Sequence, residues 1–465
     1  GIISRLDYLQ KLGVGALWLS PVYPSPNKDN GYDISDYCNI HPNYGTLQDM
    51  DTLIAEAKKR DIRIIMDLVI NHTSDQHEWF QKSRRRIEPY TDYYIWRKGE
   101  KGKKPTNWGN FFGGDCWEYD DLRGEYYLHL FAKEQPDLNY HNEAVIEAIE
   151  EAMHFWLERG VAGFRCDVIN IIYKEAIKNG KWRPALTGSE YYLSTPGCHR
   201  VLHRLHEDVL AKYDAFTVGE TVFVTPKMAD DLANPARGEL STVFAFEHME
   251  TDCYKIKWFL RRFSPDRFFA CLTKWQKALP WNTVYLENHD QPRSVSRFGN
   301  DTQYHDESAK ALATLVLTLR GTPFLYEGQE IGMTNFDFSD MEKVQDVESI
   351  NIWNMGKQLH LPYSLRWRMI KTKSRDNART PMQWNDSPNA GFTTGTPWLS
   401  VNGNYPRINV AEQENAPNSV LAYYRQLIAF RNGSEILQAG DFSELYRKDG
   451  VYAYRRSLNV ESLIV

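Results

Sequence analysis

The sequence has few cysteines, and their positions give no sign of a cross-linked or metal-held fold. Six cysteines occur among 465 residues, widely spaced and without a Cys-x-x-Cys pair. Scattered residues of this kind indicate reduced thiols and argue against a disulfide framework or a structural zinc site. They are Cys38, Cys116, Cys166, Cys198, Cys253 and Cys271.

Long apolar runs and large blocks of one charge are also missing. No stretch reaches the roughly 18 apolar residues that indicate a membrane-spanning helix, and neither an internal repeat nor a low-complexity tract occurs. The net charge is −6, from 55 basic and 61 acidic residues, and the one basic run, residues 82–86, is short. Nucleic acids and membranes are therefore not expected as partners.

Aromatic residues, by contrast, are abundant. They make up 13% of the chain, with 14 tryptophans and 27 tyrosines. This composition fits either a large core rich in rings or a carbohydrate enzyme whose sugars stack on aromatic faces, and composition alone leaves both open. The length allows a barrel of roughly 250 residues with further domains beside it.

Apolar runs typical of strands alternate with amphipathic stretches typical of helices, which predicts βα units and a parallel sheet. The clearest helix is expected over residues 143–158, with Asn142 as its N-cap and Gly160 at its end. The strand-like runs are residues 16–19, 63–69, 163–169, 215–219, 242–246, 283–286 and 323–326. A (β/α)8 barrel needs one strand more, so the first strand is expected upstream of Gly1.

Two stretches interrupt this alternation. Residues 73–140, rich in aromatic residues, glycine and proline, are too long for a simple loop and are interpreted as an inserted subdomain. Residues 334–398 are a second irregular stretch. After a helix around residues 423–431, short β segments begin at Phe442. The predicted domains are a barrel of residues 1–72 and 141–434, the insertion, and the start of a C-terminal β domain at 435–465, with both chain ends interpreted as cuts.

Polar and charged residues follow four of the predicted strands at their C-terminal ends, where (β/α)8 barrels place their active sites. A single aspartate there is usually a helix cap and a single histidine usually structural, but four such ends together favour an active site. The residues are Asp67, Asn71 and His72 at the end of the second run, Arg165 and Asp167 at the end of the third, Glu220 at the end of the fourth, and His289 and Asp290 beyond the sixth.

Two carboxylates on either side of a glycosidic bond can cleave it, and a separation near ~5 Å gives retention through a covalent glycosyl-enzyme. Arg165 lies two residues before Asp167 and so points to the same side of its strand. We expect the arginine to keep Asp167 ionised, which makes Asp167 the nucleophile and Glu220 the acid/base. Asp290 then serves as a third carboxylate that binds sugar hydroxyls and favours the transition state.

Several strings, in this order, make the chain similar to the α-amylase family of glycoside hydrolases and, within it, to the oligo-1,6-glucosidase branch. They are GYDISDY, DLVINHTSDQH, GFRCDVIN, VGET, ENHDQPR, GTPFLYEGQEIGM and SRDNARTPMQW. The resemblance covers essentially the whole chain and implies a (β/α)8 barrel. It assigns Asp167 as nucleophile, Glu220 as acid/base and Asp290 as transition-state carboxylate. It assigns His72, His289 and Arg165 to sugar binding.

The resemblance also implies a pocket for the non-reducing end of the substrate. Its positions align with Asp29, Tyr32, Phe112, Phe131, Gln135 and Arg375. A salt bridge between Asp29 and Arg375 would close the pocket, so that the enzyme releases one glucose at a time. In this branch a valine after the nucleophile, here Val168, accompanies α-1,6 linkages, although a β-branched residue is also what a strand favours.

Three features depart from the family pattern. Cys166 stands where methionine is common and Tyr140 where tryptophan is common, and neither is expected to matter much. Relatives also begin with a strand and an Asp-rich calcium-binding loop, which would precede Gly1. No metal site is therefore predicted within this sequence, although a longer protein could bind structural Ca²⁺, and the chemistry needs no cofactor. A monomer in the cytoplasm is expected.

The favoured function is an exo-acting α-1,6-glucosidase that hydrolyses isomalto-oligosaccharides. Close alternatives are a trehalose-6-phosphate hydrolase, which would need basic residues facing a phosphate, a sucrose isomerase that excludes water from the intermediate, and an α-1,4-glucosidase. A remote alternative is a non-catalytic, glycosidase-like transporter subunit. That alternative is disfavoured because such proteins have lost catalytic carboxylates, and Asp167, Glu220 and Asp290 are all present here.

Overall fold

The computed structural model describes residues 1–183, 186–254 and 256–465. The chain divides into two compact units, and each is described by itself. The first unit comprises Gly1–Gln10 and Val14–Ala245, and the second comprises Lys11–Gly13 and Phe246–Val465. No helix in the described ranges is long and apolar enough to cross a membrane.

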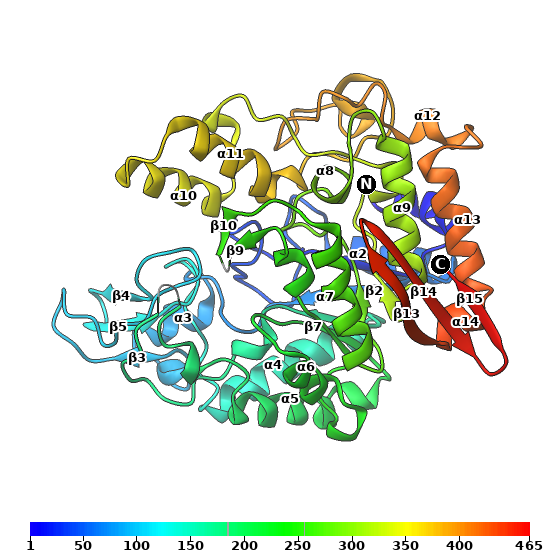
Figure 1. The fold of residues 1–465 in the computed structure, drawn as a ribbon. Helices are drawn as coiled ribbons and strands as arrows, with labels where there is room; N and C mark the ends of the chain where they lie inside the picture. The colour runs from blue at the N-terminus through cyan, green and yellow to red at the C-terminus, as the bar shows by residue number, and fades with distance from the viewer. Residues whose placement is uncertain (184–185, 255) are drawn as a thin grey trace. The chain divides into compact units, whose positions relative to one another are not determined.

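A parallel sheet forms the centre of the first unit (Figure 1). Its order is β1-β2-β6-β7-β8, and every neighbouring pair is parallel. The strands are β1 (Ala16–Leu19), β2 (Arg63–Leu68), β6 (Gly163–Cys166), β7 (Phe216–Glu220) and β8 (Thr242–Phe244). Each begins within a residue of its predicted start, which confirms five of the predicted strands and their parallel pairing.

The helices of this unit alternate with the strands, as the βα pattern predicts. The helix over Glu143–Glu158, α4, has the predicted bounds, and the Asn142 side chain accepts a hydrogen bond from the Ala144 N–H at 3.1 Å. Gly160 follows it with a φ of +99°, a left-handed conformation that suits glycine. The other helices are α1 (Leu6–Leu12), α2 (Leu47–Lys58), α5 (Pro196–Asp208) and α6 (Pro226–Ala233).

Between β2 and α4 the chain forms a small sheet of its own (Figure 1). Its three strands are antiparallel in the order β3-β5-β4. They are β3 (Trp96–Arg97), β4 (Trp117–Asp120) and β5 (Glu125–Leu128), and α3 (Glu78–Ser83) precedes them. Several aromatic residues of this stretch are buried in one core cluster, among them Trp108, Trp117 and Tyr126. The limits of an inserted subdomain stay a prediction.

The second unit contains one further parallel pair, β11 (Thr283–Val284) with β12 (Thr322–Pro323), at the two remaining predicted strand positions. β9 (Cys253–Tyr254) and β10 (Ile256–Leu260) form a separate antiparallel pair. The helices are α7 (Pro265–Ala278), α8 (Ser294–Phe298), α9 (His305–Thr318), α10 (Val347–Gln358), α11 (Tyr363–Lys373), α12 (Val410–Glu414), α13 (Val420–Asn432) and α14 (Glu435–Ala439).

The prediction that residues 334–398 are irregular is wrong in part, because α10 and α11 lie within them. Asp346 caps α10 by accepting hydrogen bonds from two backbone N–H groups. The apolar stripe of α11 is narrow and broken by basic residues, so its periodicity is weak in the sequence. Packing stabilises the pair instead, because Trp353, Met369 and Ile370 share one buried cluster.

The predicted change to β structure near Phe442 is confirmed. Strands β13 (Asp441–Lys448), β14 (Val451–Leu458) and β15 (Glu461–Ile464) form an antiparallel sheet (Figure 1). Asp449 and Gly450 make the first turn, both with positive φ, as a two-residue hairpin turn of type I′ requires.

Gly163 opens β6 with a φ of +150°, and a Cβ at this position would lie 1.8 Å from the carbonyl oxygen of Phe216. The obstacle is the backbone of β7, which is held in register on both sides. We therefore predict that Gly163→Ala lowers the free energy of unfolding by about 3 kcal/mol or more, measured by urea denaturation. Gly15→Ala is the control, since a Cβ at Gly15 meets no atom within 4 Å. Equal stability of the two variants would contradict this account.

Candidate active site

The parallel register of three neighbouring strands brings the acidic residues of the first unit together. Asp67 on β2 pairs with Arg165 on β6, and Glu220 is the last residue of β7. Asp167 directly follows β6, and its N–H donates to the Leu68 carbonyl at 2.9 Å. All these side chains therefore lie at the C-terminal edge of one sheet, as the sequence predicts.

One buried guanidinium contacts three carboxylates at this edge. Arg165 Nη1 lies 2.6 Å from Asp167 Oδ1 and 2.8 Å from Asp67 Oδ1. Its Nη2 lies 2.6 Å from Glu220 Oε2. Arg165 is 1% exposed, and the three acids are buried too. A single positive charge thus faces up to three negative charges where water cannot screen them.

The expectation that Arg165 keeps the pKa of Asp167 low is wrong. Burial raises the pKa of Asp167 well above its usual range, and the charges of Glu220 and Asp67 add to the rise, while Arg165 opposes it. The guanidinium of Arg165 cannot offset the effects of burial and of the neighbouring charges on Asp167, because Asp67 and Glu220 share it. The Asp167 and Glu220 carboxyls each lie 2.6 Å from a nitrogen of this one guanidinium, so the two acids are close neighbours. The roles of the two acids therefore do not follow from the position of Arg165.

Asp67 belongs to this cluster, although sequence reasoning noted its position without including it among the site residues. Its carboxylate accepts hydrogen bonds from Trp18 Nε1 at 3.2 Å and from the Tyr32 hydroxyl at 3.0 Å. Burial raises its pKa to about 6, against the pull of Arg165. The signal that could have identified Asp67 is its position, because it lies at the same C-terminal edge of the predicted sheet as the residues that were assigned to the site.

Val168 is not a strand residue, so strand packing does not explain its identity. Strand β6 ends at Cys166, and Val168 has the left-handed backbone angles φ +35° and ψ +39°. A β-branched residue rarely adopts this region, and such strain costs on the order of 1–3 kcal/mol. The backbone N–H of Val168 donates to Glu220 Oε2 at 3.3 Å. The strained turn therefore directs a main-chain donor at the second carboxylate.

Most of the predicted pocket residues of the first unit lie in one cluster. His72 Nε2 lies 3.1 Å from the Tyr32 carbonyl oxygen and 3.0 Å from Gln135 Nε2. Gln135 Nε2 donates to Asp29 Oδ2 at 3.3 Å, and the Phe131 ring centre lies 5.1 Å from that of His72. Burial lowers the pKa of His72 to about 4, so the imidazole is neutral near pH 7.

Aromatic rings form an apolar wall beside this cluster. Phe112, a predicted pocket residue, meets Phe131 edge to face at 5.7 Å. Phe111 stacks on Phe131 at 4.9 Å, and sequence reasoning missed it. The sequence shows that Phe111 and Phe112 are adjacent, but it does not indicate that both rings contact Phe131.

A buried lysine was also missed. Lys174 Nζ lies 2.6 Å from Asp137 Oδ2 and donates to Asn71 Oδ1 at 2.7 Å. The Asn71 amide in turn lies 3.1 Å from His72 Nδ1. This contact chain fixes the orientation of the His72 ring. In the sequence, Lys174 looks like an ordinary polar residue at the end of an apolar run.

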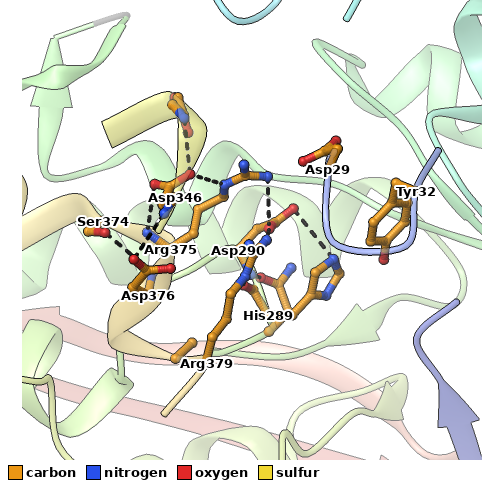
Figure 2. A network of polar contacts seen from close by, with 12 residues as sticks. Asp29, Tyr32, His289, Asp290, Asp346, Ser374, Arg375, Asp376 and Arg379 are labelled. Atoms are coloured by element: carbon orange, nitrogen blue, oxygen red, sulfur yellow. Dashed lines mark hydrogen bonds and ion pairs between the residues drawn. The ribbon is translucent and has the colours of Figure 1, made fainter. Parts of the chain in front are cut away.

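The second unit holds the remaining predicted residues in a network of charges (Figure 2). Arg379 Nη2 lies 2.6 Å from Asp290 Oδ1, and Arg375 Nη1 lies 3.5 Å from the same atom. His289 Nε2 is 3.5 Å from Asp290 Oδ2. These positive neighbours hold the pKa of Asp290 well below its usual range despite its burial. Asp290 is therefore ionised, and Arg379 is a contact that sequence reasoning missed.

Arg375 is anchored within its own unit. Its Nε lies 2.7 Å from Asp346 Oδ1, and the charge of Arg375 holds the pKa of Asp346 well below its usual range (Figure 2). Asp29 and Arg375 belong to different units, so the salt bridge predicted between them stays a prediction. The same holds for the position of Asp290 relative to Asp167 and Glu220.

Within residues 1–183, 186–254 and 256–465, no group of three or more His, Cys, Asp or Glu side chains could hold a metal ion. The six cysteines are free thiols, as predicted, and Cys38 is exposed while the others are buried. Structural Ca²⁺ therefore stays an expectation about a segment outside this sequence.

Comparison with known families decides the identity of the fold. Residues 1–440 match the family model described as the alpha amylase catalytic domain. The chain belongs to the α-amylase family. This confirms the predicted glycoside hydrolase class, and the family's (β/α)8 barrel with a C-terminal β domain is the fold of the chain.

Individual relatives agree. The chain is 50% identical to an oligo-1,6-glucosidase of Parageobacillus thermoglucosidasius and 44% identical to a trehalose-6-phosphate hydrolase of Bacillus subtilis (strain 168). All of the chain aligns with 85% and 84% of these relatives, respectively. A crystal structure of isomaltulose synthase from Klebsiella sp. LX3 matches it with a TM-score of 0.96 and 41% identity, over 100% of this chain and 85% of that one.

The pKa of Asp167 depends on the charge of Asp67. Because that charge raises the pKa of Asp167, we predict that Asp67→Asn lowers it. The acid limb of the pH profile of kcat/KM for an aryl α-glucoside, which reports the ionisation of Asp167 as the expected nucleophile, should then move to lower pH. Tyr23→Phe is the control, since Tyr23 donates only to the Asp67 backbone carbonyl and the charge is kept. An unmoved profile in Asp67→Asn would refute the coupling.

Proposed function

We propose that this family member is a retaining, exo-acting α-glucosidase that hydrolyses α-1,6 linkages at the non-reducing end of isomalto-oligosaccharides. The observation that carries the proposal is the pair of carboxyls, Asp167 and Glu220, each 2.6 Å from a nitrogen of one guanidinium. Inverting enzymes separate their two carboxyls by roughly 6.5–9.5 Å to admit a water, whereas retaining enzymes keep them about 5 Å apart. The close pair supports retention.

In the proposed reaction Asp167 attacks the anomeric carbon while Glu220 protonates the leaving oxygen. The glycosidic C–O bond breaks and a covalent glucosyl-enzyme forms. Glu220, now a base, takes a proton from water, and that water releases α-glucose and regenerates Asp167. For this reaction Asp167 has to be ionised to attack, and Glu220 has to carry the proton that the leaving oxygen receives.

Binding of the terminal glucose is assigned to the cluster around His72. Neutral His72, Gln135 and Asp29 offer donors and acceptors to sugar hydroxyls, and the phenylalanine wall offers an apolar surface. Asp290, ionised in its own network, is proposed to favour the oxocarbenium-like transition state. Exo action rests on the predicted pair of Asp29 and Arg375, which would close the pocket behind one glucose.

The α-1,6 preference rests on Val168 and on the names of several relatives. Val168 has left-handed backbone angles beyond the end of its strand, so strand packing does not explain why a valine stands there. Relatives named oligo-1,6-glucosidase or glucan 1,6-alpha-glucosidase are 43–50% identical to this chain. The proposal includes the division into a barrel, an inserted subdomain at residues 73–140 and a C-terminal β domain that starts at residue 435. It also includes a monomeric state and a cytoplasmic location.

A substrate panel tests the linkage. Isomaltose and panose should be cleaved at their α-1,6 bonds, with kcat/KM at least tenfold above that for maltose, sucrose or trehalose-6-phosphate. Proton NMR of the first turnovers should show α-glucose before mutarotation. Faster cleavage of trehalose-6-phosphate would replace the proposed substrate, conversion of sucrose to an isomer would indicate transglycosylation, and β-glucose as first product would refute retention.

Azide separates the roles of the two acids. With an aryl α-glucoside, Asp167→Ala should lose at least about 10³-fold in kcat and, with added azide, form β-glucosyl azide, because azide occupies the space of the nucleophile. Glu220→Ala should instead give α-glucosyl azide, since azide attacks the covalent intermediate from the opposite face. The reverse pattern would exchange the two assignments.

A further inference from the structure

The backbone ladder between β6 and β7 ends just before the two acids that the proposed reaction needs. Its last pair is Cys166 with Gly219. Beyond it, the Asp167 N–H donates to Leu68 on β2, and the Thr221 N–H donates to Phe244 on β8 at 3.3 Å. The segments that follow the two strands thus bond to opposite neighbours. Something other than the ladder has to set the distance between the two carboxyls.

Asn170 bridges these segments with its side chain. The Val222 N–H donates to Asn170 Oδ1 at 3.0 Å, and Asn170 Nδ2 donates to the Val222 carbonyl at 2.9 Å. The orientation of the amide is unambiguous, because a backbone N–H needs an acceptor and a carbonyl needs a donor. The two bonds reproduce a reciprocal pair of a β ladder, with a side chain in place of one strand.

The bridge is buried and anchored at its base. Asn170 is fully buried in the short 3₁₀ turn Ile169–Ile171 that follows the strained Val168. Its carbonyl accepts the Ser194 N–H at 2.7 Å, and its second amide hydrogen is donated to Ser194 Oγ at 3.1 Å. With three side-chain hydrogen bonds in a dry site, the amide has little freedom to turn.

We propose that Asn170 is a positioning residue that clamps the segment after Asp167 to the segment after Glu220 and so sets the separation of the two carboxyls. Asn170 lies three residues after Asp167, and Val222 lies two residues after Glu220, so a shift of either segment moves a reacting group directly. The inference rests on the proposed glycosidase reaction and deepens it. A misplacement of about 1 Å in such a pair can reduce turnover about 10²-fold.

The kinetic test uses Asn170→Ala, which removes both bonds to Val222, and Asn170→Asp, which keeps the acceptor but loses the donor. For an aryl α-glucoside we expect kcat to fall about 10²-fold in Asn170→Ala, with KM changed less than threefold. Because the charge of Glu220 raises the pKa of Asp167, a wider separation of the carboxyls should also move the acid limb of the kcat/KM profile to lower pH.

Ser194→Ala is the matched control, because it removes one hydrogen bond of the same amide and leaves both bonds to Val222. Its kcat and pH profile should equal those of the parent enzyme. Hydrogen exchange followed by mass spectrometry provides a readout without substrate. Peptides containing Val222 should exchange faster in Asn170→Ala and at the parental rate in Ser194→Ala.

The outcomes are distinct. Faster exchange with unchanged kcat and pH profile would overturn the positioning role and leave a purely structural one. Unchanged exchange would overturn the clamp itself, as would equal kinetic losses in Asn170→Ala and Ser194→Ala. If Asn170→Ala does not fold, Asn170→Asp has to show the loss of kcat and the altered exchange. A parent enzyme without activity on any α-glucoside would refute the proposed function, while the exchange data would still decide whether the clamp exists.

Discussion

The acidic centre of this protein depends on one buried guanidinium that three carboxylates share. Arg165 is withdrawn from water together with Asp67, Asp167 and Glu220, and with every acid ionised the group would carry a net charge of −2. Unscreened like charges at this depth are costly, and burial raises the pKa values of Asp67 and Asp167. The rings of Trp18 and Tyr32 lie 4.9 and 5.6 Å from the guanidinium carbon and hold the arginine in place. Removing that cation would leave the sheet edge with buried, uncompensated acids.

The cluster can form only because neighbouring strands are in a fixed parallel register. Asp67 lies opposite Arg165, and the ladder between β6 and β7 places Asp167 and Glu220 just beyond its last pair. A slip of one residue would turn each side chain to the other face of the sheet. The close approach of β7 at Gly163 is part of the same constraint, because a larger residue there would force the strands apart. The hydrogen bonds that hold the strands in register therefore also decide which charged side chains lie together at the edge of the sheet.

Sequence reasoning reached the elements with strong patterns and the residues with strong motifs. The helix over residues 143–158 has a wide apolar stripe and a capping asparagine, and it was predicted to the residue. Helix α11 has a stripe broken by arginine and lysine, and tertiary packing decides its structure. The grouping of His72, Gln135 and Asp29 followed from the resemblance. Arg379, Lys174 and Asn170 did not, because their roles depend on which side chains long-range folding places beside them, and a single sequence does not carry that information.

The division of labour between Asp167 and Glu220 does not follow from their contacts within the protein. Nη1 of Arg165 serves both Asp67 and Asp167, whereas Nη2 faces Glu220, and Val168 adds a backbone donor to Glu220. These contacts do not overcome burial and the neighbouring charges, which raise the pKa of Asp167, whereas the proposed reaction needs Asp167 ionised. A bound sugar changes this balance, because positive charge that develops at the anomeric carbon favours ionised Asp167, and the leaving oxygen needs a protonated Glu220. The substrate itself therefore completes the assignment of nucleophile and acid.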